Sequence, residues 1–406
     1  MERIISPWRT AGAAAAFILT IIQGAFAQTP HASGALLDSL IAQALRNNPG
    51  IRSADMYISS SQGRIEQAES WDDPQAGIEF YATPVTSFDP IRDGKETDYF
   101  IQQAIPFPGK KSLMGNTAKA GVQTAVYLAG DARRRLILNV KTTYAMIYSL
   151  QRQMDVNAEN IQLLQQIRSS TQTKYSVAEA TQGDVLKTSI ELEKLQNDST
   201  SLTRQLQSAI AMMNALRGAP NADDIGRVAK ITPVLPVYSL DSLVDIALDS
   251  RPDLLAMQSE VDMDRTEAVA SEQNRLPDFM VRGTYKVMVG ATDNWALMVG
   301  VNIPIAPWAS GKYEGKIEEE EYAAEATLQE HHNMNNMIRY EVTDAWTKVR
   351  SSWEQIERYK QTILPQAEQA LQSSLVGYQT NKTDFLSLMD SERMLNAMET
   401  DYYMLI

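Results

Sequence analysis

The sequence predicts a mainly α-helical chain with a small β part, in which long coiled helical hairpins form an α-barrel and four short strands per chain join a β-sheet. Three observations predict this fold class. The chain repeats itself at a fixed offset, its long polar segments space apolar residues by four and three, and two pairs of short segments alternate apolar with polar residues. The four-three spacing is typical of coiled helices, and the alternation is typical of strands with one apolar face.

The chain begins with a stretch that predicts an export signal over residues 1–27. Two arginines precede an apolar run from Ala11 to Ile22, and Ala25-Phe26-Ala27 forms an A-x-A cleavage site. The apolar run is shorter than the roughly 20 residues that a spanning helix needs, which disfavours an uncleaved membrane anchor. We therefore expect cleavage before Gln28. No later stretch is apolar enough to predict a spanning helix, so any contact with a membrane interior would be made by the strands of a closed barrel.

The rest of the chain is two copies of one unit. Leu37-Asp38-Ser39-Leu40 matches Leu240-Asp241-Ser242-Leu243, 203 residues later, and Tyr175 matches Tyr378 at the same offset. A unit of about 200 residues is too long for a solenoid repeat, so we expect one pseudo-symmetric body. The domains that this predicts are a first structural repeat over 28–218, a linker over 219–237 and a second structural repeat over 238–406, whose last helix stops short of its counterpart in the first repeat.

The helices after each strand pair carry coiled-coil seams. In the first repeat Leu136, Val140, Thr143 and Ile147 begin a run that steps by four and three without a slip, and Val342 begins a similar run in the second repeat. A helix over about 112–174 would be on the order of 90 Å long, which is too long for the core of a compact domain. Helices of this length are expected to pack side by side into a tube.

Each repeat also holds a pair of strand-like segments, about 75–105 in the first and about 279–303 in the second. The alternation alone fits a soluble hairpin packed on helices as well as a membrane wall. The long coiled helices favour the wall, in which the apolar face of each strand contacts lipid. Arg282 and Lys286 would then face the lumen. The residues expected to face lipid are Phe279, Val281, Tyr285, Trp295, Leu297, Val299 and Val301.

Four strands per chain cannot close a barrel by themselves, because about eight strands is the minimum for a filled barrel. Three chains would supply twelve strands, which leaves an open lumen. The sequence therefore predicts a homotrimer with a 12-stranded β-barrel, and an acidic lumen that favours cations over anions.

Charge and composition exclude several classes of function. The chain has 37 Lys plus Arg against 50 Asp plus Glu, a net charge of −13, so its surface does not attract nucleic acid. It has no cysteine and three histidines, which excludes thiolate chemistry and leaves little for acid–base catalysis. No P-loop, dinucleotide fingerprint or nucleophile elbow occurs. We therefore expect no enzyme, no cofactor and no metal site.

Two local segments are distinctive: one is Gln102-Gln103-Ala104-Ile105-Pro106-Phe107-Pro108-Gly109-Lys110, and the other runs from Gly377 to Asp390. Both resemble segments of a known family, the TolC-like outer-membrane channel proteins of Gram-negative tripartite efflux and secretion systems. The first is similar to the strand-exit segment of the heavy-metal-efflux, CzcC-like branch. The second is similar to the second hairpin turn of that branch, with Asn381 where glycine is usual. Together with the duplication and the order of elements, the resemblance covers the whole mature chain.

The resemblance implies a function. In the family, three protomers form a β-barrel through the outer membrane that continues into a helical tunnel across the periplasm, docked on an adaptor and an inner-membrane pump. The chain is thereby expected to be the outer-membrane exit duct of a tripartite efflux system in a Gram-negative bacterium. The partners implied are a periplasmic adaptor (membrane fusion) protein, a pump of the resistance-nodulation-division type and outer-membrane lipid. Heavy-metal cations are one candidate substrate.

The resemblance also assigns roles to the two turns between the long helices, about 175–186 and about 378–390. In the family these tips form the periplasmic entrance and meet the adaptor. Asp184 could instead cap the helix after the first tip, and Asp390 could lie on a solvated helix face. The gate residues implied are Asp184, Asp384, Ser387 and Asp390, and the tip residues implied to contact the adaptor are Tyr175, Ala178, Glu179, Tyr378, Asn381 and Lys382.

One alternative from another class remains at this stage, a soluble periplasmic coiled-coil adaptor or scaffold. An adaptor would need additional small barrel domains and usually has one helical hairpin, whereas this chain has two long hairpins and little else. The exported substrate cannot be read from the sequence, because in such systems the pump selects it.

Overall fold

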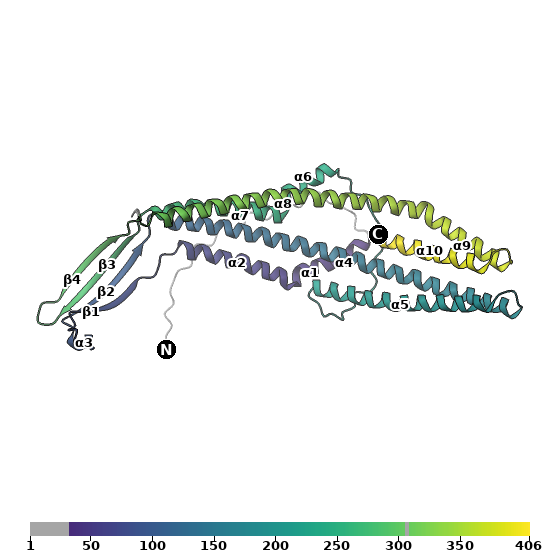
Figure 1. Cartoon of the computed structure of the whole chain (residues 1–406), viewed down its shortest axis with the longest axis horizontal. Coiled ribbons are helices and arrows are strands. Elements are labelled where there is room, and N and C mark those ends of the chain that lie inside the picture. Colours follow the sequence, from purple (N-terminus) through teal and green to yellow (C-terminus); the bar gives the residue numbers. More distant parts are fainter. Residues whose placement is uncertain (1–31, 305–307) are drawn as a thin grey trace.

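The computed structural model describes residues 32–304 and 308–406 of the chain. The molecule is elongated, with a small sheet at one end, long helices along its length and two helical hairpin tips at the other end (Figure 1). The predicted fold class, mainly α with a small β part, is confirmed. The expected export signal over 1–27 lies outside the described residues. Among the described helices, none combines the length and the apolar character needed to cross a membrane.

Each repeat begins with two helices separated by a proline. In the first repeat α1 (Ala32–Asn47) precedes α2 (Pro49–Glu69), and in the second α6 (Leu240–Ser250) precedes α7 (Pro252–Glu272) and the short 3-10 helix η1 (Gln273–Arg275). Proline suits the first position of a helix, because its missing N–H would have no partner there, and it disfavours helical backbone in the residue before it. The matching prolines therefore start the second helix of each pair at the same place in the two repeats.

The long helices differ between the repeats. In the first, α4 (Lys110–Ser176) runs unbroken for 67 residues, about 100 Å, and α5 (Gln182–Leu216) returns along it. In the second, α8 (Ser310–Arg358) is followed by the π-helical turn η2 (Tyr359–Ile363), α9 (Leu364–Gln379) and α10 (Phe385–Leu405). Pro365 lies in the first turn of α9 and cannot donate the backbone hydrogen bond of a continuous helix, which accounts for the π-helical turn before it.

The sheet joins the two repeats. Its strands are β1 (Gln75–Tyr81), β2 (Glu96–Ile105), β3 (Phe279–Met288) and β4 (Asn294–Val301), in this order and all antiparallel to their neighbours. A short helix, α3 (Pro90–Asp93), lies in the connection between the first two strands. The two central strands come from different repeats.

The strand-exit segment that the sequence singled out fastens the sheet to the helices. Gly109 caps α4 with a φ of 99°, a left-handed conformation that glycine adopts without strain. The ammonium group of Lys110 lies 2.7 Å from the Asp278 carboxylate and donates a second hydrogen bond to the carbonyl oxygen of Leu276 at 2.9 Å. This segment therefore ties the end of β2 in the first repeat to the start of β3 in the second.

The described residues contain two hydrophobic clusters. One lies in the middle of the molecule between α1, α4 and α5, and the other lies toward the tips between α4, α5, α9 and α10. The seam predicted from Leu136 onward is buried in these clusters. The seam predicted in the second repeat is largely open in a single chain, since Val349 is 44% exposed, although Ile356 is buried. The last helix stays helical to Leu405, and Ile406 packs against the middle cluster.

Candidate functional site

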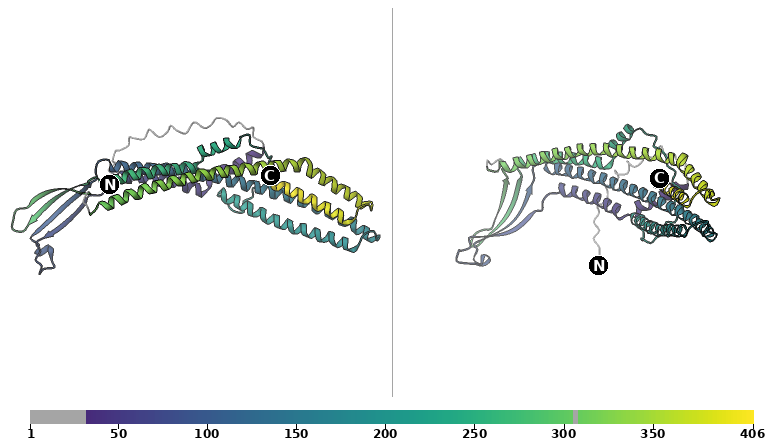
Figure 2. Two further views of the ribbon diagram at one scale, coloured as in Figure 1. Left: turned by 45° about the horizontal axis from the view of Figure 1, so that its top comes forward. Right: turned by 45° about the vertical axis from the view of Figure 1, so that its right-hand side comes forward.

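The hairpin α4–α5 and the hairpin α9–α10 lie side by side and end in neighbouring turns, farthest from the sheet (Figure 2). We call these turns the first tip (residues 177–181) and the second tip (residues 380–384). Ala178 and Asn381 occupy the same place in the two repeats and both adopt left-handed backbone, with φ of 62° and 58°. The asparagine thus occupies the position where the resembled family usually has glycine, and it tolerates the left-handed conformation better than most residues.

The first tip is closed by a capping box. Thr181, not Asp184, is the N-cap of α5. The Asp184 backbone N–H donates to the Thr181 hydroxyl at 3.2 Å, and the Asp184 carboxylate accepts hydrogen bonds from the Thr181 backbone N–H and hydroxyl at 3.1 and 2.8 Å. Asp184 therefore takes part in capping α5, as the alternative interpretation held, but the N-cap residue itself is Thr181, three positions earlier. The Asp184 carboxylate is held toward its own turn.

The two acidic residues at the second tip, Asp384 and Asp390, have different environments. Asp384 is the N-cap of α10, and its carboxylate accepts a hydrogen bond from the Ser387 backbone N–H at 2.7 Å, which lowers the pKa of Asp384 from its ordinary value. The Asp390 side chain is 75% exposed, and its carboxylate is 3.9 Å from the Arg393 guanidinium. Ser387 and Asp390 therefore lie on solvent-facing parts of α10, where a neighbouring chain or an ion could reach them.

Polar contacts join the two tips, and we call Lys174, Glu179 and Asn381 the tip bridge. The Lys174 ammonium donates to the Asn381 side-chain oxygen, and the Asn381 amide donates to the Glu179 carboxylate at 3.2 Å. The same ammonium is 4.9 Å from the centre of the Tyr378 ring, whose hydroxyl donates to the Thr171 hydroxyl at 3.2 Å. The tip bridge therefore connects the first repeat to the second at the end of the molecule.

The residues expected to contact an adaptor lie in two environments. Tyr175, Ala178, Glu179, Asn381 and Lys382 are exposed on the two tips. Tyr378 is 6% exposed and packs edge to face against Phe385, with ring centres 6.1 Å apart. Within a single chain, Tyr378 is thus part of the support beneath the tips and the other five form their surface.

A second connection between the hairpins lies behind the tips. The guanidinium of Arg393 on α10 donates to the Glu191 carboxylate on α5 at 2.8 Å, and the Lys194 ammonium lies 3.1 Å from the same carboxylate. The hydrogen bond from Arg393, followed by that from Lys194, lowers the pKa of Glu191 against the effect of partial burial. Neither this pair nor Lys174 was predicted from the sequence. For Glu191 and Arg393 the available signal was opposite charge at a separation of 202 residues, close to the repeat offset, whereas Lys174 meets the uncharged Asn381.

The register of the sheet places all residues expected to face lipid on one face. Tyr285 lies opposite Trp295, and Val281 lies opposite Val299. Trp295 is 77% exposed in the single chain. Side chains on one face of neighbouring strands form a continuous row, so this face is an apolar surface. The seven residues of the sequence prediction lie on it, and their contact with lipid stays a prediction.

Charged side chains occupy the opposite face of the same sheet. The Arg282 guanidinium is 2.5 Å from the Glu79 carboxylate, and the Lys286 ammonium is 2.7 Å from Glu96 and 3.0 Å from Asp98. These ion pairs cross from β3 to β1 and β2. The face that carries Arg282 and Lys286 is therefore polar, as expected for a wall with lipid on one side and water on the other.

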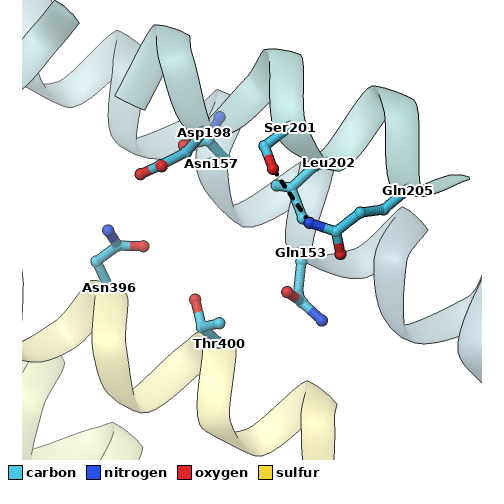
Figure 3. A pocket seen from close by; sticks show the side chains of 8 residues that line it. All are labelled: Gln153, Asn157, Asp198, Ser201, Leu202, Gln205, Asn396 and Thr400. Carbon is cyan, nitrogen blue, oxygen red and sulfur yellow. Dashed lines mark hydrogen bonds between the residues drawn. The ribbon is translucent and has the colours of Figure 1, made fainter. Parts of the chain in front are cut away.

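A hollow of about 200 Å³ lies between α4, α5 and α10 (Figure 3). Beside it, the Asn160 amide donates to the Asn396 side-chain oxygen at 2.9 Å. Amides and hydroxyls predominate in the lining, so the space between these three helices is polar. In residues 32–304 and 308–406, no three His, Asp or Glu side chains come together in a way that could hold a metal ion. The hollow is lined by Gln153, Asn157, Asp198, Ser201, Leu202, Gln205, Asn396 and Thr400.

The elongated fold, with a small sheet at one end and two helical tips at the other, is shared with outer-membrane channels of known structure. Residues 40–219 match the family model described as outer membrane efflux protein. The solved structure of CusC has a TM-score of 0.77 with this chain at 16% identity, covering 91% of this chain and 88% of that one. The outer membrane protein VceC of Vibrio cholerae has a TM-score of 0.74 at 18% identity, covering 91% and 92%. These matches show that the chain is similar to TolC-like outer-membrane efflux channels over most of its length.

The chain is also similar to a metal-resistance protein. The cobalt-zinc-cadmium resistance protein CzcC of Cupriavidus metallidurans is 21% identical over 369 residues, which is 90% of this chain and 85% of that protein. The alternative of a soluble periplasmic adaptor or scaffold is not favoured, because the family model that matches residues 40–219 describes outer membrane efflux proteins. The expectation that the chain is not an enzyme stays a prediction.

Proposed function

We propose that three copies of this chain form the outer-membrane exit duct of a tripartite efflux system, with the sheets joined in a 12-stranded barrel and the helices in a periplasmic tunnel. The observation that carries the proposal is the difference between the two ends of the molecule. An apolar sheet face lies at one end, and two bridged hairpin tips lie at the other (Figure 1). Lipid would contact the first, and a periplasmic adaptor would contact the second.

The duct would conduct passively, and energy would come from an inner-membrane pump of the resistance-nodulation-division type. The sequence has no nucleotide-binding motif that could energise transport itself. The exposed tip residues Tyr175, Ala178, Glu179, Asn381 and Lys382 offer both charges and short side chains to an adaptor hairpin. Tyr378 would support this surface from below.

The proposed substrates are heavy-metal cations. Two observations support this class: the similarity to the cobalt-zinc-cadmium resistance protein CzcC and the net charge of −13. An acidic lumen lowers the energy of a cation relative to an anion along the whole path. Asp390, which is solvated on α10 in the single chain, would lie at the narrow end of the tunnel together with Asp184, Asp384 and Ser387.

The test begins with the full-length protein expressed in a Gram-negative host. We expect it in the outer-membrane fraction, as a trimer in detergent that forms conducting pores in planar bilayers. Deleting the gene in a strain that carries the matching pump should lower the tolerated concentration of cobalt, zinc or cadmium. A monomer that fractionates with soluble periplasmic proteins would overturn the proposal. Normal trimers with unchanged metal tolerance would overturn the substrate class alone.

A further inference from the structure

Two glutamates lie on the inward face of α10, where a coiled coil normally has apolar residues. Glu392 and Glu399 alternate with Leu388 and Leu395 at spacings of four, three and four. Glu392 is 1% exposed, and its Oε2 atom has no hydrogen-bond partner among the described residues. An ionised carboxylate in such a place is costly, because neither water nor a donor compensates its charge.

The charged groups that face these two glutamates come from four helices. Glu191 on α5 and Arg393 on α10 act on Glu392, and Arg393 already donates to Glu191. Glu159 on α4 and Glu368 on α9 act on Glu399. Three of these four groups are acidic, so their charges oppose the ionisation of Glu392 and Glu399.

Burial and the neighbouring carboxylates act on both glutamates in the same direction. Burial, followed by the charge of Glu191, raises the pKa of Glu392 to about 7. Burial, followed by the charges of Glu159 and Glu368, raises the pKa of Glu399 to about 7. Both groups therefore change charge near neutral pH, where most carboxylates are already ionised.

We propose that Glu392 and Glu399 form a proton-operated switch that sets how tightly α10 packs against α4 and α9. With both carboxyl groups protonated, α10 lies tightly in the seam. With both ionised, lost solvation and repulsion from the carboxylates of Glu191, Glu159 and Glu368 loosen α10, and with it the second tip that it supports. The inference concerns the packing of one chain, and only its consequence for conduction rests on the proposed function.

The direction of the pH effect on α10 packing is set by the protonation state that the folded chain favours, which is the neutral carboxyl group. When a carboxyl group has a raised pKa in the folded state, its stabilising effect is complete below the ordinary range near 4.5. That effect is lost as the pH rises through about 7. Acid therefore tightens α10, and alkali loosens it. Glu392 is already buried within a single chain, so neighbouring protomers are not needed for its burial.

Hydrogen exchange on the full-length trimer in detergent tests the switch. Amide protection of peptides from α10 would be measured at pH 6, 7 and 8, after correction for the intrinsic exchange rate. We expect wild-type protection in α10 to fall by about tenfold per pH unit near pH 7. The double variant Glu392→Gln, Glu399→Gln cannot ionise and should stay protected across the range. Glu193→Gln, an exposed glutamate on α5, is the matched control and should behave as the wild type.

Two outcomes would overturn the inference: wild-type protection of α10 that does not change with pH, or a double variant that loses protection with pH as the wild type does. If the glutamine variant does not assemble, Glu392→Leu supplies the same test without a polar group. Conductance in planar bilayers at the same pH values separates the two proposals. A pH-dependent α10 in a protein that forms no pores would support the switch and contradict the duct.

Discussion

The ammonium group of Lys174 donates a hydrogen bond to the side-chain oxygen of Asn381, a residue 207 positions later in the chain, and so joins the two hairpin tips. The nitrogen is nearly buried, and its other neighbours are the Tyr378 ring and the Glu179 carboxylate. Removing a nearly buried charge leaves its hydrogen-bond partners unsatisfied, and this costs more free energy than an exposed ion pair contributes. The Lys174 side chain is therefore held in place by these partners. The tips of the two repeats therefore move together.

Removing this charge should separate the tips. We expect Lys174→Ala to cost about 2 kcal/mol at the tip bridge, which increases the population of separated tips by about thirtyfold. In planar bilayers the variant trimer should show a higher resting conductance than the wild type. Lys187→Ala, an exposed lysine on α5, removes the same charge outside the bridge and serves as the control. Equal conductance of Lys174→Ala and the control would mean that the bridge does not hold the tips.

Asp184 acts through the start of α5, and two variants separate this role from a role in the channel. Loss of a capping residue costs about 1 kcal/mol, so Asp184→Ala and Thr181→Ala should both speed amide exchange in the first turn of α5. Both should also raise the resting conductance by a similar factor, with little change in ion selectivity. If Asp184→Ala alters selectivity and Thr181→Ala does not, the carboxylate faces the conducting path and its capping role is secondary.

Much of the fold could be predicted because local patterns and burial agree. The alternation around Val281 and Val299 predicts the strand faces, and the buried seam from Leu136 onward follows the four-three spacing. The exposed Val349 shows the limit of that pattern. A seam spacing predicts that a face needs a partner, and it does not say whether the partner belongs to the same chain.

The candidate site was predicted less completely, because tertiary contacts decide it. The resemblance assigned Tyr378 to the tip surface, whereas its ring is buried beside Phe385 within the chain. Lys174 and Arg393 gave no local signal, since each finds its partner across the two repeats. Pro365 was visible in the sequence. The π-helical turn before it could not be predicted, because it depends on how the long helix adjusts its backbone hydrogen bonds where Pro365 has no N–H to donate.

The two faces of the sheet can be distinguished with labels, because the chain has no native cysteine. We expect a spin label at Val299→Cys on β4 to be relaxed by lipid-soluble oxygen, since this side chain lies on the apolar face. A label at the adjacent Met298→Cys should respond to a water-soluble reagent, because Met298 lies opposite Arg282 on the charged face. The reverse pattern would show that the apolar face lines the lumen.

The ion pair of Glu191 and Arg393 should stabilise the packing of the two hairpins at neutral pH and not in acid, whereas Glu392 stabilises it in acid. A lowered pKa means that the stabilisation is present above the ordinary glutamate value of 4.5 and is lost as the pH falls through the lowered value. We expect Arg393→Ala to destabilise the trimer by about 1 kcal/mol at pH 7, a modest value because Arg393 is half exposed, and to have no effect in acid. Arg350→Ala, from an exposed pair on α8, should cost less at pH 7. A loss of equal size at pH 7 and in strong acid would show that Arg393 acts through packing of its stem alone.

The last prediction concerns ion selectivity at the tips. Asp390 is solvated in the single chain. Its charged neighbour among the described residues is Arg393, whose guanidinium is 3.9 Å away and already bonded to Glu191. In a trimer three such carboxylates would approach the narrow end of the tunnel, where converging charge favours cations. We expect Asp390→Ala to lower the ratio of cation to anion permeability in planar bilayers, with a similar pore size. Ser387→Asp, which adds a second acidic position one turn earlier on α10, should raise the same ratio. If neither variant changes the ratio, Asp390 is a solvated helix residue, and the acidic part of the path lies elsewhere along the duct.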